Sequence, residues 1–459
     1  MSNKEQIAYK IEQGELQLLR FVWCDNSNVM RAKSIYLPSF LARMQREENS
    51  DILAHLEQEV TITAAMQSVP ATRDEPAPAA GLPPVEDVLL VPAWETFAQA
   101  PGEKKVATII CNMFAKSKPW VHCPRSFLQR MELQLADHDL VIQAGFELEF
   151  YLLQPAENGK LPVPVDHTVF ATTSAAHKSH KVINKILKSL QKQNVPPEQY
   201  LAESGPGQQE ITLERCHPLQ LADRLVRARG TVHNIAGNYQ LVASFLPLIF
   251  PDATGSGLHV HMSLWQNGQN HMAGPDQWGL SDTANSYMAG ILKHLPALMA
   301  VTTPSKNSYR RIKPHAWSGA FQAWGIGNKE AALRLITNQS SGKATNFELK
   351  TMDASANPYI ALGCIIAAGL DGIRQREKLP NPVEIDPGSF SPEERSQAGI
   401  KPLPTNLEAA LAELEADQAL LEAMTPEFAR VFAAVRRFEL QTMAELSFEE
   451  ERLLLLERY

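Results

Sequence analysis

Residues 145–152 read Gly-Phe-Glu-Leu-Glu-Phe-Tyr-Leu, and the rest of the chain can be interpreted outward from this stretch. As a β-strand, it would point its even-numbered apolar residues to one face and Glu147, Glu149 and Tyr151 to the other. The two carboxylates would then lie about 7 Å apart. Like charges on a half-buried surface repel and lose hydration, so they must be solvated, protonated or bridged by a cation. This pattern fits two interpretations: an edge strand with one solvent-exposed polar face, or one half of a metal site.

Further segments present ionisable residues in the same way. Residues 255–264 begin Gly-Ser-Gly and, as a strand, place His259, His261 and Ser263 on one face. Residues 346–350 read Asn-Phe-Glu-Leu-Lys and alternate likewise. Arg334 lies in another short predicted strand, and a Gly/Pro-rich turn joins Glu203 to Glu210. The candidate metal ligands are therefore Glu147, Glu149, Glu203, Glu210, His259 and Glu348.

Five carboxylates and one imidazole suit two hard divalent cations, Mg²⁺ or Mn²⁺, better than zinc. Zinc favours more histidine or cysteine, and the sequence has no HExxH motif. A metal role is favoured for His259 because glycines before it let the backbone approach a ligand closely. His177, His180 and His315 lack such a context, and a structural role is the simpler interpretation for them.

Bulk composition limits the remaining possibilities. A chain of 459 residues can bury a large core and should form at least two domains. The net charge of −8, with acids and bases interspersed, does not favour a nucleic-acid or anionic-membrane surface. Five widely spaced cysteines without CxxC spacing indicate reduced thiols and a cytoplasmic location. No apolar signal segment or membrane-spanning run is apparent.

We place a domain boundary near residue 116, between an N-terminal domain (1–116) and a larger domain (117–459). In the first, two strands flank an expected hairpin turn at 25–28, and a helix should follow through about residue 56. Prolines make 68–102 mostly irregular. Helices are expected in the second domain at about 125–139, 174–193, 219–238, 355–375, 405–423 and 425–446.

Taken together, these motifs resemble the glutamine synthetase family, broadly its bacterial type-I class. The resemblance covers about residues 120–375 strongly and the first hundred more weakly. Its carriers are residues 146–150, 203–210 and 255–263, then 307–311 (Asn-Ser-Tyr-Arg-Arg), Arg334, Glu348 and 356–359 (Ala-Asn-Pro-Tyr), in the family's order. The sequences around Glu348 and at Trp324-Gly325 are similar to those of the nodulin/FluG-type or gamma-glutamyl-amine ligase branches.

The resemblance implies an α+β fold: a small N-terminal β-grasp-like domain and a large catalytic domain with a curved antiparallel sheet backed by helices. It also implies a ring-shaped homo-oligomer whose active sites lie between subunits. Glu149, Glu203 and Glu210 would hold one metal, and Glu147, His259 and Glu348 the other. Arg311 would bind the glutamate carboxylate and Arg334 the phosphates. His261, Ser263 and Lys343 would lie on the nucleotide side, and Gly255, Trp317 and Lys350 on the substrate side.

The implied reaction is an ATP-dependent ligation. ATP would phosphorylate the γ-carboxylate of glutamate to an acyl phosphate, and ammonia or an amine would then displace phosphate. Because both partners of the first step are anions, metals and arginines must neutralise charge and align them. The implied cofactors are two Mg²⁺ or Mn²⁺ ions per site, with ATP as co-substrate.

Two departures from the family concern the ammonium site. Trp317 stands where ammonia-using members carry a glutamate, and residues 66–82 lack the Asp-Gly-Ser motif of the N-terminal domain. An indole could cover an organic amine by cation–π contact, whereas simple loop packing is the alternative for Trp317. We therefore expect an organic amine as substrate more than ammonia.

Other departures concern the phosphates and regulation. Lys329 replaces a usual arginine and loses bidentate geometry, while Asn346 and Lys350 flank Glu348 where arginines are usual. These changes leave a second hypothesis open, that of a non-catalytic, ring-forming structural or regulatory relative. No tyrosine stands near 387–390, so regulation by adenylylation is not expected.

Overall fold

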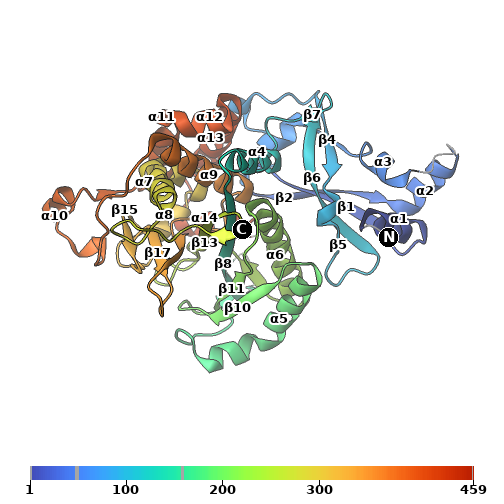
Figure 1. Ribbon diagram of the computed structural model, residues 1–459. Helices are drawn as coiled ribbons and strands as arrows, with labels where there is room; N and C mark the ends of the chain where they lie inside the picture. The colour runs from blue at the N-terminus through green and yellow to red at the C-terminus, as the bar shows by residue number, and fades with distance from the viewer. Residues whose placement is uncertain (1–2, 47–50, 157–159, 457) are drawn as a thin grey trace.

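The computed structural model describes residues 3–46, 51–156, 160–456 and 458–459 of the chain. It is an α+β protein with two main sheets (Figure 1). A small sheet lies beside the N-terminal helices, and a large curved sheet is backed by the helices of the second half. The expected fold class is confirmed.

The small sheet has the order β2-β1-β6-β4-β3, with β5 and β7 beside β6. β1 runs parallel to β6, and the other pairs are antiparallel. Its core is built from side chains that alternate along β1 and β6 and from the helices α1, α2 and α3. The bounds are α1 Asn3–Glu12, β1 Leu18–Cys24, β2 Met30–Tyr36, α2 Leu37–Arg46, α3 Ile52–Leu56, β3 Thr61–Thr63, β4 Asp87–Pro92, β5 Ala98–Gln99, β6 Val106–Ala115 and β7 Lys118–Pro119.

The turn at 25–28 joins β1 to β2 as predicted, but it is fully buried. Asn28 adopts φ 61° and donates its amide to the carbonyl of Ala354 at 2.9 Å. Asn357 donates to the carbonyl of Asp25 at 2.8 Å, and the Tyr459 hydroxyl donates to that of Ser27 at 2.9 Å. The turn therefore lies between the small sheet and the second half of the chain.

The large sheet has the order β10-β11-β8-β13-β18-β17-β16, with β9 and β12 beside β8 and β14 beside β13. All pairs are antiparallel except β16 with β17, which is parallel. The bounds are β8 Val141–Gln154, β9 Val163–Pro164, β10 Pro197–Ala202, β11 Gln208–Leu213, β12 Val242–Ser244, β13 Leu258–Gln266, β14 Gln269–Asn270, β16 Trp324–Ile326, β17 Leu333–Thr337 and β18 Ala344–Leu349.

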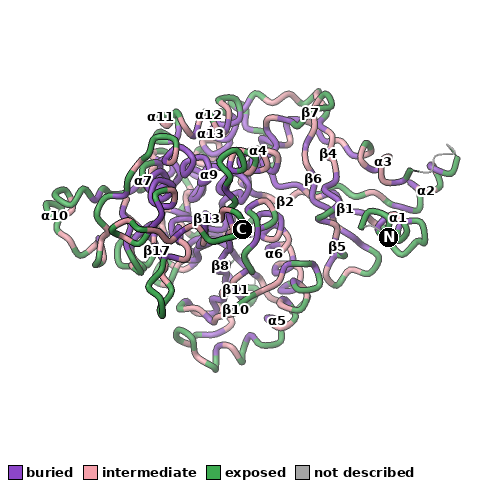
Figure 2. The backbone as a smooth tube through the Cα atoms, viewed as in Figure 1, coloured by how far each residue is buried: buried purple, intermediate pink, exposed green. Residues whose placement is uncertain are grey.

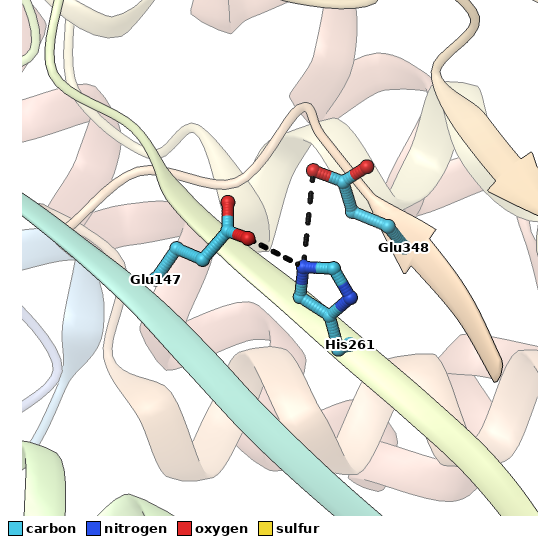
Figure 3. Close-up of side chains that lie close together, drawn as sticks. All are labelled: Glu147, His261 and Glu348. Atoms are coloured by element: carbon cyan, nitrogen blue, oxygen red, sulfur yellow. Dashed lines mark hydrogen bonds and ion pairs between the residues drawn. The ribbon is translucent and has the colours of Figure 1, made fainter. Parts of the chain in front are cut away.

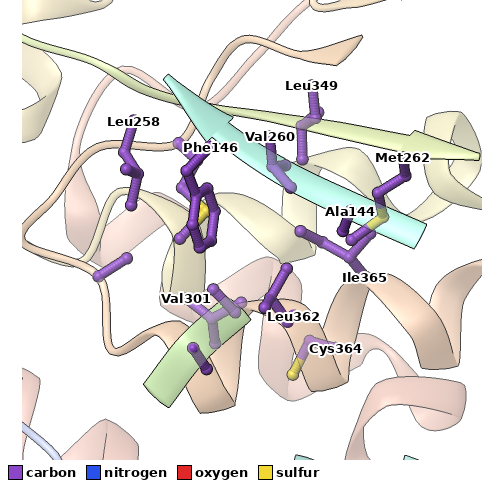
Figure 4. Close-up of a cluster of buried hydrophobic side chains, with 14 of the residues drawn as sticks. Ala144, Phe146, Leu258, Val260, Met262, Val301, Leu349, Leu362, Cys364 and Ile365 are labelled. Carbon is purple, nitrogen blue, oxygen red and sulfur yellow. The ribbon is translucent and has the colours of Figure 1, made fainter. Parts of the chain in front are cut away.

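The apolar face of this sheet forms the main core. Phe146 of β8, Val260 of β13 and Leu349 of β18 point to the same side, toward Leu362 of α9 (Pro358–Gln375) and Val301 of α7 (Asp282–Thr302) (Figure 4). The alternation expected for 145–152 is confirmed, because the even-numbered residues join this core and Tyr151 joins a separate cluster. The polar face is left free for the site.

Two glycines let α7 and α9 pack closely. A Cβ on Gly372 would lie 2.1 Å from the carbonyl oxygen of Ser286, and one on Gly290 would lie 2.3 Å from that of Ala368. The backbones are thus in contact where side chains would otherwise separate them, and α9 remains buried almost throughout (Figure 2).

The remaining helices differ in part from expectation. The predicted helix at 405–423 is two helices, because Asp417 ends one and caps the next. The helix predicted through residue 56 crosses residues 47–50, which lie outside the described part of the chain, and α2 and α3 stand on either side. Helices α7, α8, α10 and α14 were not predicted. Further bounds are α4 Pro124–Ala136, α5 Thr173–Lys192, α6 Pro218–Asn238, α8 Ser308–Arg311, β15 Phe321–Gln322, α10 Pro392–Gln397, β19 Lys401–Pro402, α11 Leu407–Ala416, α12 Gln418–Met424, α13 Pro426–Thr442 and α14 Phe448–Leu455.

The smaller core extends from Ile7 to Cys123, and the division near residue 116 stays a prediction. Within the described residues, no helix combines the length and apolar character needed to cross a membrane.

Candidate functional site

A cavity of about 600 Å³ lies on the polar face of the large sheet. Most residues predicted from the sequence line it, although they come from segments up to about two hundred positions apart. The predicted residues in its lining are Glu147, Glu149, Glu203, Glu210, Gly255, His259, Arg311, Trp317, Arg334, Glu348 and Lys350. The sheet register explains this convergence, because residues directly opposite on neighbouring strands share a face.

The register places Glu147 of β8 opposite His259 of β13, and Glu348 of β18 opposite Arg334 of β17. His259 Nδ1 lies 3.1 Å from Glu147 Oε2 and 3.3 Å from Glu348 Oε1. Three strands therefore bring the predicted ligands of one metal into contact.

His261 joins the same group. Its Nε2 lies 2.9 Å from Glu147 Oε1 and 4.0 Å from Glu348 Oε1 (Figure 3). Ligand atoms of Glu147, His261 and Glu348 all lie within 4.8 Å of one another, a spacing that could hold a metal ion. The sequence-based assignment of His261 to the nucleotide side stays a prediction, and the structure adds that it contacts two predicted metal ligands.

Asn346, one of the departures from the family, orients His261. Its amide Nδ2 lies 3.0 Å from His261 Nδ1. With the amide donating to Nδ1, the ring proton is on Nε2 and is donated to Glu147.

Glu149 lies beside the Gly/Pro-rich turn. It is opposite Glu210 in the register of β8 and β11, and its Oε2 accepts from the backbone N–H of Gly257 at 2.8 Å. The Gln208 amide donates to the same oxygen at 3.3 Å and to the carbonyl of Gly255 at 3.1 Å. Gln208 was not singled out from the sequence, although its place inside the turn between two candidate ligands was a usable signal.

The second set of carboxylates carries excess negative charge. Burial raises the pKa of Glu210 to about 8, and repulsion from Glu147, Glu149 and Glu203 adds to the effect. Burial also raises the pKa of Glu203, with the neighbouring Glu149 contributing. This part of the cavity therefore attracts a proton or a metal cation.

The first set is compensated by bases. Burial opposes ionisation of Glu147, yet hydrogen bonds with His259 and His261 prevail and lower its pKa. Burial and the ammonium of Lys350 disfavour a charged His259, but Glu147 and Glu348 prevail and raise its pKa to about 9. Glu348 is held ionised by His259 and by Lys350 in the same way, since they lower its pKa against the effect of burial.

The donor set fits divalent cations of the magnesium and manganese type. It is rich in carboxylates, the described cysteines lie buried outside the cavity, and Glu210 and Glu203 resist ionising without a cation.

Arg311 is buried at the edge of the cavity and held by backbone carbonyls. It donates to Thr351 at 2.5 Å and to Met352 at 3.0 Å. Gly255 makes room for it, because a Cβ there would lie 2.4 Å from the Arg311 Cγ. The glycine is thus needed for close approach of a side chain of the protein itself, which extends the role expected for it.

Arg334 and Lys350 both pair with Glu348. Arg334 Nε donates to Oε2 at 2.5 Å, and Lys350 Nζ donates to Oε1 at 3.1 Å. Glu348 is almost fully buried, so this pair of cations keeps a charged carboxylate in the core of the site.

The loop at 313–317, which is exposed, forms one wall. Trp317 lies in the left-handed region at φ 53°, and its side chain faces the ammonium of Lys329, which lies 5.0 Å from the ring centroid. The Trp317 N–H donates to both carboxylate oxygens of Glu330 at 3.1 Å. The sequence did not predict that Trp317 contacts Lys329 and Glu330, because no local pattern links these positions.

Some predicted residues lie elsewhere in the described chain. Ser263 is buried and hydrogen-bonded to Gln143 and Trp265, and Lys343 is exposed after the turn at 339–341; neither lines the cavity. His177 and His180 lie on α5, outside the site. His315 does line the cavity and pairs with Asp386 at 2.5 Å.

Comparison with known sequences identifies a family. The family model described as "Glutamine synthetase, catalytic domain" matches residues 121–453. A type-1 glutamine synthetase of Dictyostelium discoideum is 31% identical, covering 100% of this chain and 93% of its own length. A gamma-glutamylpolyamine synthetase of Streptomyces coelicolor is 35% identical over 69% of each chain.

Solved structures agree with these sequence matches. The complex of GmaS with ADP superposes with a TM-score of 0.82 at 26% identity, covering 98% of this chain and 99% of its own. A crystal structure described as a novel glutamine synthase homolog gives a TM-score of 0.82 at 27% identity, covering 97% and 99%. The likeness therefore extends over both sheets.

Proposed function

Because this chain belongs to the glutamine synthetase family of ligases, we propose that it joins the γ-carboxyl group of glutamate to an organic amine, with conversion of ATP to ADP and phosphate. The observation that carries the proposal is the cavity in which the carboxylate and histidine set meets Arg311, Arg334 and Trp317. The relative named as a gamma-glutamylpolyamine synthetase supports an amine as acceptor, and the solved complex of GmaS with ADP supports the nucleotide.

We assign the metal ligands as predicted from the sequence. Glu149, Glu203 and Glu210 would hold one cation and Glu147, His259 and Glu348 the other, with His261 beside the second set. Divalent cations bound there would neutralise the phosphates and polarise the reacting oxygens. His259 must lose its proton to act as a ligand, and Lys350 and Arg334 compensate Glu348 in the absence of a cation.

The remaining residues would orient the substrates. Arg311 would bind the α-carboxylate of glutamate, and its anchorage to the carbonyls of 350–352 would fix its position. Arg334 would stabilise the transferred phosphoryl group, with His261 on the nucleotide side; Ser263 and Lys343, which do not line the cavity, could serve the nucleotide only beyond its edge. Phosphoryl transfer makes the γ-carbonyl carbon electrophilic. The alkylammonium first releases a proton to solvent, and the resulting neutral amine attacks this carbon; phosphate leaves as the C–N bond forms, and the nitrogen gives up a second proton to yield the amide.

Trp317 supports an amine rather than ammonia alone. An indole at the cavity wall offers apolar area and a π-face to an alkylammonium, whereas the carboxylate that would favour bare ammonium is absent at this position. Members of this family are commonly oligomeric, and we propose a ring in which a neighbouring N-terminal domain borders the cavity.

A phosphate-release assay tests the proposal. The full-length protein is given ATP, Mg²⁺ or Mn²⁺, glutamate and a panel of amines with ammonia as reference, and the γ-glutamyl product is identified by mass spectrometry. We expect release that requires both glutamate and amine. No turnover with any pair, together with metal-dependent thermal stabilisation, would instead support the non-catalytic structural role.

A further inference from the structure

The loop that carries Trp317 is held in place by three contacts. Glu330 accepts the Trp317 N–H, Asp386 pairs with His315, and the Ser318 hydroxyl bridges the backbone N–H and C=O of Lys313. His315 and Trp317 both adopt positive φ, at 60° and 53°, which non-glycine residues avoid without such support. The ring is therefore fixed at the wall while 54% of Trp317 stays exposed.

The ammonium group of Lys329 already lies over the face of the Trp317 ring. Lys329 Nζ lies 5.0 Å from the ring centroid, a cation–π distance, and Lys329 itself is exposed and lines the cavity. Among the described residues, no carboxylate lies within ion-pairing distance of Lys329. The exposed ammonium of Lys329 thus lies over the indole face.

We propose that Lys329 is an internal mimic of the substrate: its alkylammonium occupies the amine subsite on the Trp317 ring in the free protein, and an incoming amine must displace it. Glu330 is a positioning residue that fixes the ring through the Trp317 backbone. This inference rests on the proposed amine-ligase function. It makes Lys329 a determinant of amine affinity, in addition to any contact it makes with phosphate.

The chemistry of the mimic indicates the class of ligand. A lysine side chain ends in an unbranched primary alkylammonium, so the subsite should accept unbranched primary alkylamines or the terminal amino group of a diamine. A neutral alcohol of the same length lacks the charge that the π-face attracts. Amines branched next to nitrogen should bind more weakly because their carbons would hold the charge away from the ring.

Direct binding tests the mimic without turnover. n-Butylamine is titrated calorimetrically into the full-length protein at pH 7.5 without nucleotide, with n-butanol as the neutral probe. Lys329→Met keeps the side-chain length and removes the charge, so we expect about two- to fivefold tighter butylamine binding, the value of one exposed cation–π contact. Lys188→Met, at an exposed position on α5, serves as the matched control and should leave the Kd unchanged.

A double-mutant cycle assigns the gain to the ring. In a Trp317→Leu background, Lys329→Met should give no gain in affinity, because the contact that it removes no longer exists. Equal affinity of the wild type and Lys329→Met, or the same gain in the Trp317→Leu background, would overturn the proposal. Absence of butylamine binding in both proteins would overturn it as well.

Two variants of Glu330 test whether it acts by positioning the Trp317 loop. Glu330→Ala should weaken butylamine binding in the Lys329→Met background by freeing the loop, whereas Glu330→Gln keeps an acceptor for the Trp317 N–H and should restore it. Equal weakening by both variants would mean that the charge, not the positioning, is required. Turnover separates the two proposals. If phosphate is released with amines but Lys329→Met leaves butylamine affinity unchanged, only the mimic proposal is refuted. If butylamine binds as expected but no amine supports turnover, only the ligase proposal is refuted.

Discussion

The glutamates of the cavity form two groups that differ in the charge of the side chains around them. Glu147 and Glu348 are ionised because histidines and cations surround them, and Glu203 and Glu210 resist ionising because other carboxylates do. Glu149 lies between the groups, fixed by the Gly257 N–H and by Gln208. Its replacement should therefore affect metal binding without disturbing the fold.

Glu149→Gln is the sharpest test of the metal assignment. The amide oxygen can still accept from Gly257, but the charge is lost, so we expect at least about a 100-fold loss of turnover, larger than typical losses at supporting ligand positions. Initial rates at saturating Mg²⁺ measure it. Glu214→Gln, an exposed glutamate after β11, is the control; near-normal activity of Glu149→Gln would refute its role as a ligand.

Trp317→Glu should shift acceptor preference toward ammonia. A carboxylate at this place restores an anion for ammonium and removes the π-face, worth about 0.5–1 kcal/mol at an exposed site. We expect the ratio of kcat/KM for ammonia to that for butylamine to rise at least about two- to fivefold. An unchanged acceptor profile would remove Trp317 from the specificity argument.

At the scale of elements, period-two patterns were informative where one strand face is apolar and the other ionisable. That is why residues 145–152, 255–264 and 346–350 could be assigned to one site before any pairing was known. α7 escaped prediction because it is buried almost all around, carries Pro296 inside, and has no polar stripe to reveal helical periodicity. Contacts such as that of Glu330 with Trp317 depend on loop geometry that no local pattern encodes.

The α7–α9 contact predicts the effect of a single methyl group. Gly372→Ala would place a Cβ 2.1 Å from the Ser286 carbonyl, so the helices must separate. We expect a loss of about 1–3 kcal/mol in the free energy of unfolding, measured by urea denaturation. Gly237→Ala on α6 is the matched control, because no neighbouring atom lies within 4 Å of an added Cβ there. This substitution should raise the free energy of unfolding by about 0.5–1 kcal/mol.

At the scale of the whole molecule, a buried histidine joins three helical segments. His294 of α7 pairs with Asp371 of α9 at 3.0 Å and with Asp417, between α11 and α12, at 2.5 Å. Burial disfavours its charged form, but the two aspartates prevail and raise its pKa. Its stabilising contribution is complete below the pKa of an ordinary histidine and declines as pH rises through the folded-state pKa.

His294→Gln should therefore destabilise the protein more at pH 6 than at pH 9. The amide keeps one donor but loses the charge, and charge-assisted hydrogen bonds contribute about 1.5–3 kcal/mol each. Thermal unfolding across this range measures the difference, with the exposed His138→Gln as control. A pH-independent loss would show that His294 acts through packing alone.

The 25–28 turn illustrates a limit of sequence reading with a wider consequence. Asp-Asn-Ser-Asn predicts a hairpin turn but not its partners, and Ala354, Asn357 and Tyr459 lie more than three hundred residues away. The hairpin that it closes cannot open without breaking those contacts. Amide hydrogens of β1 should therefore exchange with deuterium only when the entire chain unfolds, so that the small sheet and the helices of the other half behave as one cooperative unit.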